Sequence, residues 1–321
     1  MLFDKKVEAM FRSRLCTRQD NPHGIFYFSP MDFPDLQTHP YSFRSDMGHE
    51  LKGYFYHYEN PIPGRVVVFD HGMGNGHRAY MREIERLCKG GFLVFSYDHT
   101  GCMASGGSDI RGFAQSLADL DDCMKALKAE PGLKGYSFSV MGHSWGGFST
   151  MNIGALHPEI THVVSMSGFV SVERIVRQSL GAMKMYTPAI VRLEQRTNPR
   201  YARYNALESL QKTEAKVLLI YSADDKTVHK AVHYDPLYEA LGKKAHIQFL
   251  LLEEGKDHNP SYTAEAVAYK NTFWAALSKA IKDHRLDNAE DQQAFMAQYD
   301  WWRMTEQDEI VWQRILEHLN Q

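Results

Sequence analysis

Six short apolar segments alternate with longer segments of helical periodicity through the middle of the chain. The apolar segments are rich in β-branched and aromatic residues, as buried strands are; they cover residues 65–70, 91–97, 136–141, 161–166, 217–221 and 246–252. Helices are predicted between or after them, over residues 79–89, 113–127, 147–157, 234–241 and 264–284. Because neighbouring parallel strands need a crossover connection, this alternation predicts an α/β fold with a mostly parallel, doubly wound sheet.

The segments around this alternation define the expected domain organisation. Residues 41–45 and 51–57 flank the turn Asp46-Met47-Gly48 and are predicted to form a hairpin that joins the sheet. A stretch between two strands, at about residues 171–212, is too long for a simple connection, so we interpret it as a small helical cap. The expected parts are, in order, an N-terminal extension (1–40), an α/β domain that contains the cap (41–285) and a C-terminal helical extension (286–321).

The C-terminal extension contains an amphipathic helix. Val311, Ile315 and Leu319 recur at intervals of four residues, which places them on one face of a helix. We expect this apolar stripe to pack on the body of the protein. A contact in a homodimer is the alternative.

Composition excludes several classes of protein. The 321 residues include 36 Lys and Arg against 39 Asp and Glu, so the net charge of −3 argues against a nucleic-acid-binding protein. No apolar run approaches the roughly 18 residues of a membrane span, and charges interrupt residues 1–20, unlike a signal peptide. The four cysteines are scattered, which predicts free thiols and a cytoplasmic protein; they are Cys16, Cys88, Cys102 and Cys123.

The motif G-x-S-x-G occupies residues 142–146 around Ser144, and Gly147 follows. A predicted strand precedes the motif and a predicted helix follows it. A serine at such a sharp turn holds its hydroxyl out of the sheet edge, and the glycines avoid clashes across the turn. The helix N-terminus also favours negative charge that develops on a substrate. The motif in this context predicts a nucleophilic serine.

A serine hydroxyl needs a base to take its proton, and two later loops carry suitable residues. Asp224 and Asp225 follow the strand predicted at 217–221, and His258 follows the strand predicted at 246–252. Both loops leave the carboxyl end of a strand, where open α/β sheets bind their ligands.

With these loops in the order Ser, acid, His, the chain resembles the α/β-hydrolase family over roughly residues 40–285. Asp-x-x-Val at 225–228 is similar to the family's acid loop, and Gly-x-x-His at 255–258 is similar to its histidine loop. The resemblance implies that Ser144 is the nucleophile, that His258 is the general base and acid, and that Asp225 holds the histidine tautomer. Asp224 is the alternative acid, and otherwise a loop cap.

The loop at residues 71–76, His-Gly-Met-Gly-Asn-Gly, resembles the family's oxyanion loop. The resemblance implies that the backbone N–H groups of Met73 and Trp145 form the oxyanion hole, with Gly74 in place of Met73 as the alternative. The loop lacks both phosphate-binding glycine patterns. His71 and His77 lack a third ligand nearby. We therefore expect no nucleotide, metal or other cofactor.

A second loop, at residues 98–106, resembles the family's D-x-x-G-x-G-x-S turn, but Met103 stands where the second glycine is usual. We expect the turn to persist with an altered backbone. Asp98 is interpreted as structural.

Serine as the nucleophile favours acyl transfer to water through an acyl-enzyme. If the cap covers Ser144, methionines and aromatic residues form an apolar, adaptable pocket for small or medium acyl groups; the candidates are Met166, Phe169, Met183, Met185 and Tyr186. Several of these residues are equally compatible with the core. The expected activity is that of a carboxylesterase on a small ester or acyl substrate. An acylaminoacyl peptidase or thioesterase is the first alternative, and a non-catalytic binding protein on the same fold is the second.

Overall fold

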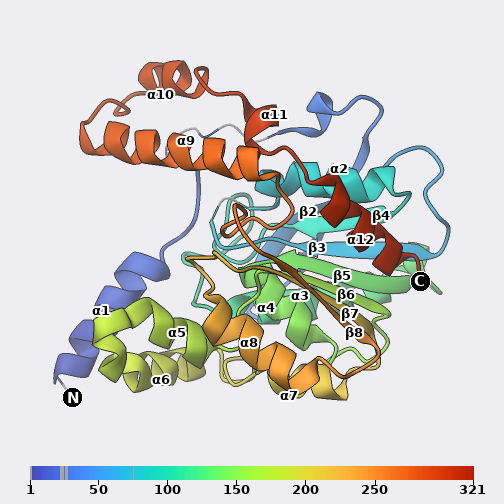
Figure 1. Cartoon of the computed structure of the whole chain (residues 1–321), viewed down its shortest axis with the longest axis horizontal. Coiled ribbons are helices and arrows are strands. Elements are labelled where there is room, and N and C mark those ends of the chain that lie inside the picture. The colour runs from blue at the N-terminus through green and yellow to red at the C-terminus, as the bar shows by residue number, and fades with distance from the viewer. Residues whose placement is uncertain (1, 22–24, 26–27, 75) are drawn as a thin grey trace.

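Eight strands form one sheet in the computed structural model, which describes residues 2–21, 25, 28–74 and 76–321. Their order is β1-β2-β4-β3-β5-β6-β7-β8 (Figure 1). The bounds are β1 Gln37–Arg44, β2 Glu50–His57, β3 Arg65–Asp70, β4 Leu93–Tyr97, β5 Ser137–His143, β6 His162–Met166, β7 Lys216–Ser222 and β8 Ile247–Leu252. Strand β2 runs antiparallel to β1 and β4, and every other neighbouring pair is parallel. The predicted hairpin and the predicted α/β fold are both confirmed.

Helices cover both faces of this sheet (Figure 1). One face carries α3 (Gln115–Ala129), α4 (Trp145–Ile153), α7 (Ala206–Lys212) and α8 (Lys230–Leu241), and the other carries α2 (Met81–Lys89) and α12 (Glu309–Leu319). Alternate residues of one strand point to opposite faces, so a strand buried on both sides is apolar at most positions. In β3, Val66 and Val68 join the core under the first face, while Val67 and Phe69 join the core under the second.

Helix α12 packs directly on the sheet. Its Val311, Ile315 and Leu319 are buried in the same core as the side chains of α2. The amphipathic stripe therefore packs on the body of the protein, as expected, and the alternative of a dimer contact through this stripe is wrong. The physical reason is that α2 alone leaves part of this sheet face uncovered, and α12 contacts the adjoining strands β6 and β7.

Two helical groups lie beyond the sheet layers (Figure 1). One group consists of α1 (Leu2–Leu15), α5 (Val172–Leu180), η4 (Gly181–Tyr186) and α6 (Thr187–Thr197), in which α1 packs against α6. The other consists of α9 (Ala264–Lys282), α10 (Ala289–Met296) and α11 (Trp301–Met304). Short 3-10 turns occur at η1 (Pro30–Asp32), η2 (His77–Tyr80) and η3 (Pro131–Leu133). Within the described ranges, none of the helices has the length and apolar character that crossing a membrane requires.

Buried His233 on α8 makes the stability of the fold depend on pH. Its Nδ1 accepts the backbone N–H of Val170 at 3.1 Å, and burial lowers its pKa to about 3. The unfolded chain binds a proton here below about pH 6.5 while the folded chain does not, so stability falls as pH drops through that window. We expect His233→Asn to reduce this pH dependence of the free energy of unfolding by up to about 1.4 kcal/mol per pH unit.

Chemical denaturation between pH 7 and pH 4 measures this effect. His284→Asn is the matched control, because the His284 side chain is 83% exposed and its positive φ of 55° suits asparagine. Equal pH dependence in the native protein and His233→Asn would contradict the assignment.

Candidate active site

Ser144 lies at the sharp turn between β5 and α4. Its backbone has φ 56° and ψ −107°, a region that costs a non-glycine residue roughly 1–3 kcal/mol. Neighbouring glycines make the turn possible: a β-carbon on Gly146 would collide with the carbonyl of Asp70, and one on Gly142 would collide with the carbonyl of Gly146. The conformation directs the serine side chain into a cavity. This is the geometry expected of a nucleophile elbow.

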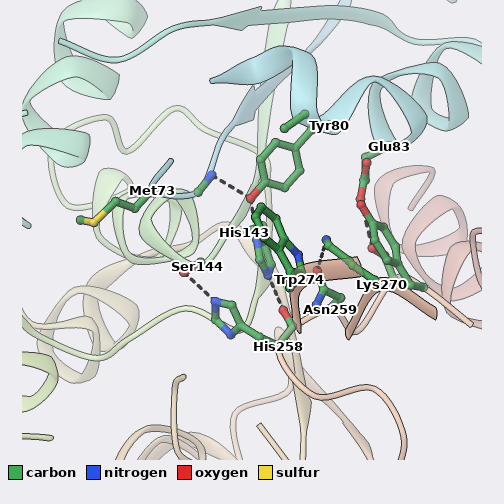
Figure 2. Close-up of a pocket in the computed structure, with 13 residues that line it drawn as sticks. Met73, Tyr80, Glu83, His143, Ser144, His258, Asn259, Lys270 and Trp274 are labelled. Atoms are coloured by element: carbon green, nitrogen blue, oxygen red, sulfur yellow. Dashed lines mark hydrogen bonds between the residues drawn. The ribbon is translucent and has the colours of Figure 1, made fainter. Parts of the chain in front are cut away.

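Ser144, His258 and Asp225 form one continuous hydrogen-bonded chain. The Ser144 Oγ lies 2.8 Å from Nε2 of His258, and Nδ1 of His258 lies 2.8 Å from Oδ2 of Asp225 (Figure 2 shows the first contact). A carboxylate only accepts hydrogen bonds, so Nδ1 carries the ring proton and Nε2 faces the serine as an acceptor. Ser144 Oγ therefore has a base in position to take its proton.

The two neighbouring aspartates differ in what they contact. The other oxygen of Asp225 accepts the backbone N–H groups of Thr227 and Val228. Burial alone would raise the pKa of Asp225, but the hydrogen bond and charge of His258, with these two N–H groups, hold that pKa below its usual range. Asp224 instead accepts the backbone N–H groups of Gly255 and Asp257, as a loop cap does. The geometry thus favours Asp225 over Asp224 as the acid.

The loop after β3 and the turn at Ser144 meet at one cavity. Met73 lines the same cavity as Ser144, and Trp145 is the first residue of α4. The first N–H groups of a helix have no intrahelical acceptor, so the N–H of Trp145 is free of that bond and adjoins Ser144. Asn75 of this loop lies outside the described residues.

The turn after β4 has the altered backbone that was expected. Met103 adopts φ 44°, the left-handed conformation that a glycine would occupy more easily. Asp98 accepts hydrogen bonds from the backbone N–H and from Nδ1 of His77. Burial opposes ionisation of Asp98, but these bonds and the neighbouring His77 lower its pKa to about 2. Asp98 therefore holds η2 in place, which fits a structural role.

A cavity of about 260 Å³ opens beside Ser144 and is lined by both polar and apolar side chains. Its walls come from the loop after β3, from η2 and α2, from the loop after β8 and from α9 (Figure 2). The lining residues are Gly72, Met73, Ala79, Tyr80, Glu83, His143, Ser144, His258, Asn259, Ser261, Tyr262, Lys270 and Trp274.

Tyr80 and His143 connect the three loops of the site. Nε2 of His143 donates to the carbonyl of His258 at 2.6 Å, so its Nδ1 accepts from the Tyr80 hydroxyl at 2.8 Å. The Tyr80 oxygen in turn accepts the N–H of Gly72 at 3.2 Å (Figure 2). Burial, and then the adjacent His258, lower the pKa of His143 to about 3, so its ring stays neutral. This chain of bonds fixes the loop after β3, the turn at Ser144 and the loop that carries His258 relative to one another.

The prediction of an apolar pocket formed by methionines and aromatic residues is wrong. None of its five candidate residues lines the cavity beside Ser144; they are Met166, Phe169, Met183, Met185 and Tyr186. Met166 and Phe169 are fully buried in the two cores, and the ring of Phe169 stacks on that of Phe148 at 4.6 Å. Met183 and Met185 are exposed, and Tyr186 packs at the edge of the core. The cavity opens toward α2 and α9, whereas these residues follow β6 or lie in the α5–α6 segment.

Several residues of the real cavity were missed, although the sequence carries a signal for two of them. Lys270 interrupts an apolar stripe of α9 formed by Val267, Phe273 and Leu277. Glu83 is buried beside Ile84 on the inner face of α2. A charged residue at an apolar position of a helix indicates a polar site within the fold. Tyr262 and Trp274 carried no comparable signal.

The sheet, the elbow and the Ser–His–Asp arrangement define an α/β hydrolase. A family model described as serine aminopeptidase, S33, matches residues 61–257, which is more than half of the chain. The chain belongs to this family.

Individual proteins and solved structures are also similar to this chain. The chain is 30% identical to a monoglyceride lipase homolog of Monkeypox virus over 134 residues, which cover 40% of this chain and about half (48%) of the viral protein. An esterase of Pyrococcus furiosus, Pf2001, superposes with a TM-score of 0.60 at 18% identity, covering 83% of this chain and 98% of the esterase. A putative dienelactone hydrolase of Klebsiella pneumoniae superposes with a TM-score of 0.55 at 18% identity, over 89% and 99% of the two chains. At these identities the two solved structures support the fold.

Proposed function

We propose that the protein is a serine hydrolase that cleaves carboxylic esters through an acyl-enzyme. The observation that carries this proposal is the pair of 2.8 Å contacts that joins Ser144, His258 and Asp225 at the wall of a cavity. The esterase and lipase names among the similar proteins agree with it.

The proposed reaction has two stages. His258 takes the proton of Ser144 as Oγ attacks the ester carbonyl, and then gives that proton to the departing alcohol. Water then attacks the acyl-enzyme with His258 as the base, which releases the acid and restores Ser144. Asp225 keeps the proton of His258 on Nδ1 and stabilises the imidazolium that forms. The N–H groups of Met73 and Trp145 are proposed to bind the oxyanion.

The mixed lining of the cavity changes the expected substrate. A volume of about 260 Å³ is still compatible with small and medium esters, but ionisable side chains stand beside apolar ones where a purely apolar lining was expected. Cytoplasmic residence stays a prediction, supported by four free and buried cysteines. A homodimer also stays a prediction.

Hydrolysis of p-nitrophenyl esters from acetate to palmitate tests the proposal. We expect the highest kcat/KM at short or medium chains, because the cavity is small and partly polar. An aminoacyl anilide and an acyl thioester run beside the esters. Turnover of either of these without ester hydrolysis would move the assignment to a peptidase or a thioesterase. No turnover, together with no labelling of Ser144 by a fluorophosphonate, would favour a non-catalytic binding protein.

A further inference from the structure

Two ionisable side chains face the cavity away from Ser144, and the proposed reaction uses neither of them. Glu83 comes from α2 and Lys270 from α9, so they approach from two different walls (Figure 2). In the part of the chain that the structure describes, neither side chain forms an ion pair, with the other or with a third residue. A carboxyl group and an amine therefore share one cavity without direct contact.

Glu83 has an oxygen that lacks a hydrogen-bond donor. The residue is 2% exposed, and its Oε1 accepts the Ser261 hydroxyl at 3.3 Å. Its Oε2 is buried and meets no donor at hydrogen-bonding geometry among the described residues, although the neighbouring Tyr262 hydroxyl interacts favourably with the same carboxylate. Burial raises the pKa of Glu83. An unsatisfied buried acceptor costs roughly 1–3 kcal/mol, so a ligand that donates a hydrogen bond here would relieve that cost.

Lys270 offers the opposite chemistry. Its Nζ donates to Oδ1 of Asn259 at 2.8 Å and lies 4.7 Å from the centre of the Tyr262 ring. An ammonium group has three donors and no acceptor, so it can also donate to a ligand in the cavity. Burial lowers the pKa of Lys270 to about 8.

The two groups together select among ligands. A carboxylate on the substrate would pair with Lys270 but repel Glu83, and an ammonium group would do the reverse. A hydroxyl group both donates and accepts, so it can donate to Glu83 and accept from Lys270. We propose that Glu83 and Lys270 form a hydroxyl-binding subsite, and that the preferred substrates are small esters that carry a free hydroxyl group. This inference rests on the proposed ester hydrolysis.

Pairs of esters with nearly equal size test the subsite. The first pair, 2-hydroxyethyl butanoate and n-propyl butanoate, places the hydroxyl on the alcohol portion. The second pair, methyl 3-hydroxybutanoate and methyl 3-methylbutanoate, places it on the acyl portion. In at least one pair we expect kcat/KM to favour the hydroxyl ester by about 100-fold or more, because a site built for a hydroxyl group leaves polar atoms unpaired with the analogue.

Lys270→Met and Glu83→Met should each reduce that preference by about tenfold or more, since each removes the polar group that binds the hydroxyl at nearly constant side-chain size. Lys279→Met is the matched control, because Lys279 lies on the same helix with its side chain 71% exposed. The control should keep the native preference. Thermal melting establishes that each variant is folded, and the two variants give independent readings of the subsite.

The outcomes separate this inference from the proposed function. Ser144-dependent hydrolysis with ratios near one in both pairs would overturn the subsite alone. A stronger preference for the carboxylate ester monomethyl succinate, lost in Lys270→Met, would overturn the hydroxyl assignment in favour of an anion. If no ester is turned over but a fluorophosphonate labels Ser144, glycerol should slow labelling of the native protein and not of Lys270→Met; no protection would overturn the subsite. Absence of both turnover and labelling would overturn both proposals.

Discussion

Ser144→Ala should lower kcat for ester hydrolysis by about 10⁶-fold, because loss of the nucleophile costs about as much as loss of a whole triad. The change removes one oxygen and keeps the β-carbon, so the strained turn with φ 56° is equally accessible to alanine. We therefore expect a melting temperature close to that of the native protein. Initial rates on a short p-nitrophenyl ester and labelling by a fluorophosphonate measure the effect.

Ser278→Ala is the matched control for this experiment, since Ser278 is exposed on α9. It should keep native activity and labelling. Full ester hydrolysis by a folded Ser144→Ala protein would show that Ser144 is not the nucleophile, and the two-stage reaction would have to be abandoned.

Asp225→Asn should lower kcat by about 10⁴-fold, the loss given by the corresponding change in the serine-protease triad. The reason is the tautomer of His258. An amide can donate to Nδ1, which moves the ring proton to Nε2 and leaves no lone pair facing Ser144. Steady-state kinetics on the best ester, with thermal melting to establish folding, give the measurement.

Asp224→Asn provides the matched comparison at the adjacent residue. Asp224 accepts two backbone N–H groups and does not contact His258, and an asparagine oxygen can keep one of those bonds. We expect a decrease in kcat of less than about tenfold, in line with loss of a single hydrogen bond in a loop. A decrease as large as that expected for Asp225→Asn would indicate that Asp224, and not Asp225, is the acid.

The central sheet could be predicted from the sequence for a physical reason. A strand buried on both faces is apolar at most positions, so the parallel strands appear as short, mainly apolar runs. Crossover connections then require helices between them. The elbow was equally accessible, because the turn around Ser144 tolerates only glycine at Gly142 and Gly146.

The position of the cavity could not be predicted from the sequence in the same way. Met183 and Met185 have the flexible apolar side chains expected of an adaptable acyl pocket, yet they are exposed on η4. The cavity instead depends on where α9 lies relative to α2, and no periodicity in either helix encodes that arrangement. Glu83 and Lys270 are 187 residues apart in sequence and face one cavity only because both helices flank the loop that carries His258.

The sequence by itself determined the α/β class, the sheet with its crossovers and the order of the serine, acid and histidine loops. These features follow from local patterns: burial on two faces, the period of a helix and the small residues of a tight turn. The tertiary structure decided which aspartate contacts His258, where the apolar stripe of α12 packs and which side chains form the cavity. Those outcomes depend on contacts between distant segments, and whether a charged side chain ends in solvent or in a shared cavity is settled only when the elements pack together.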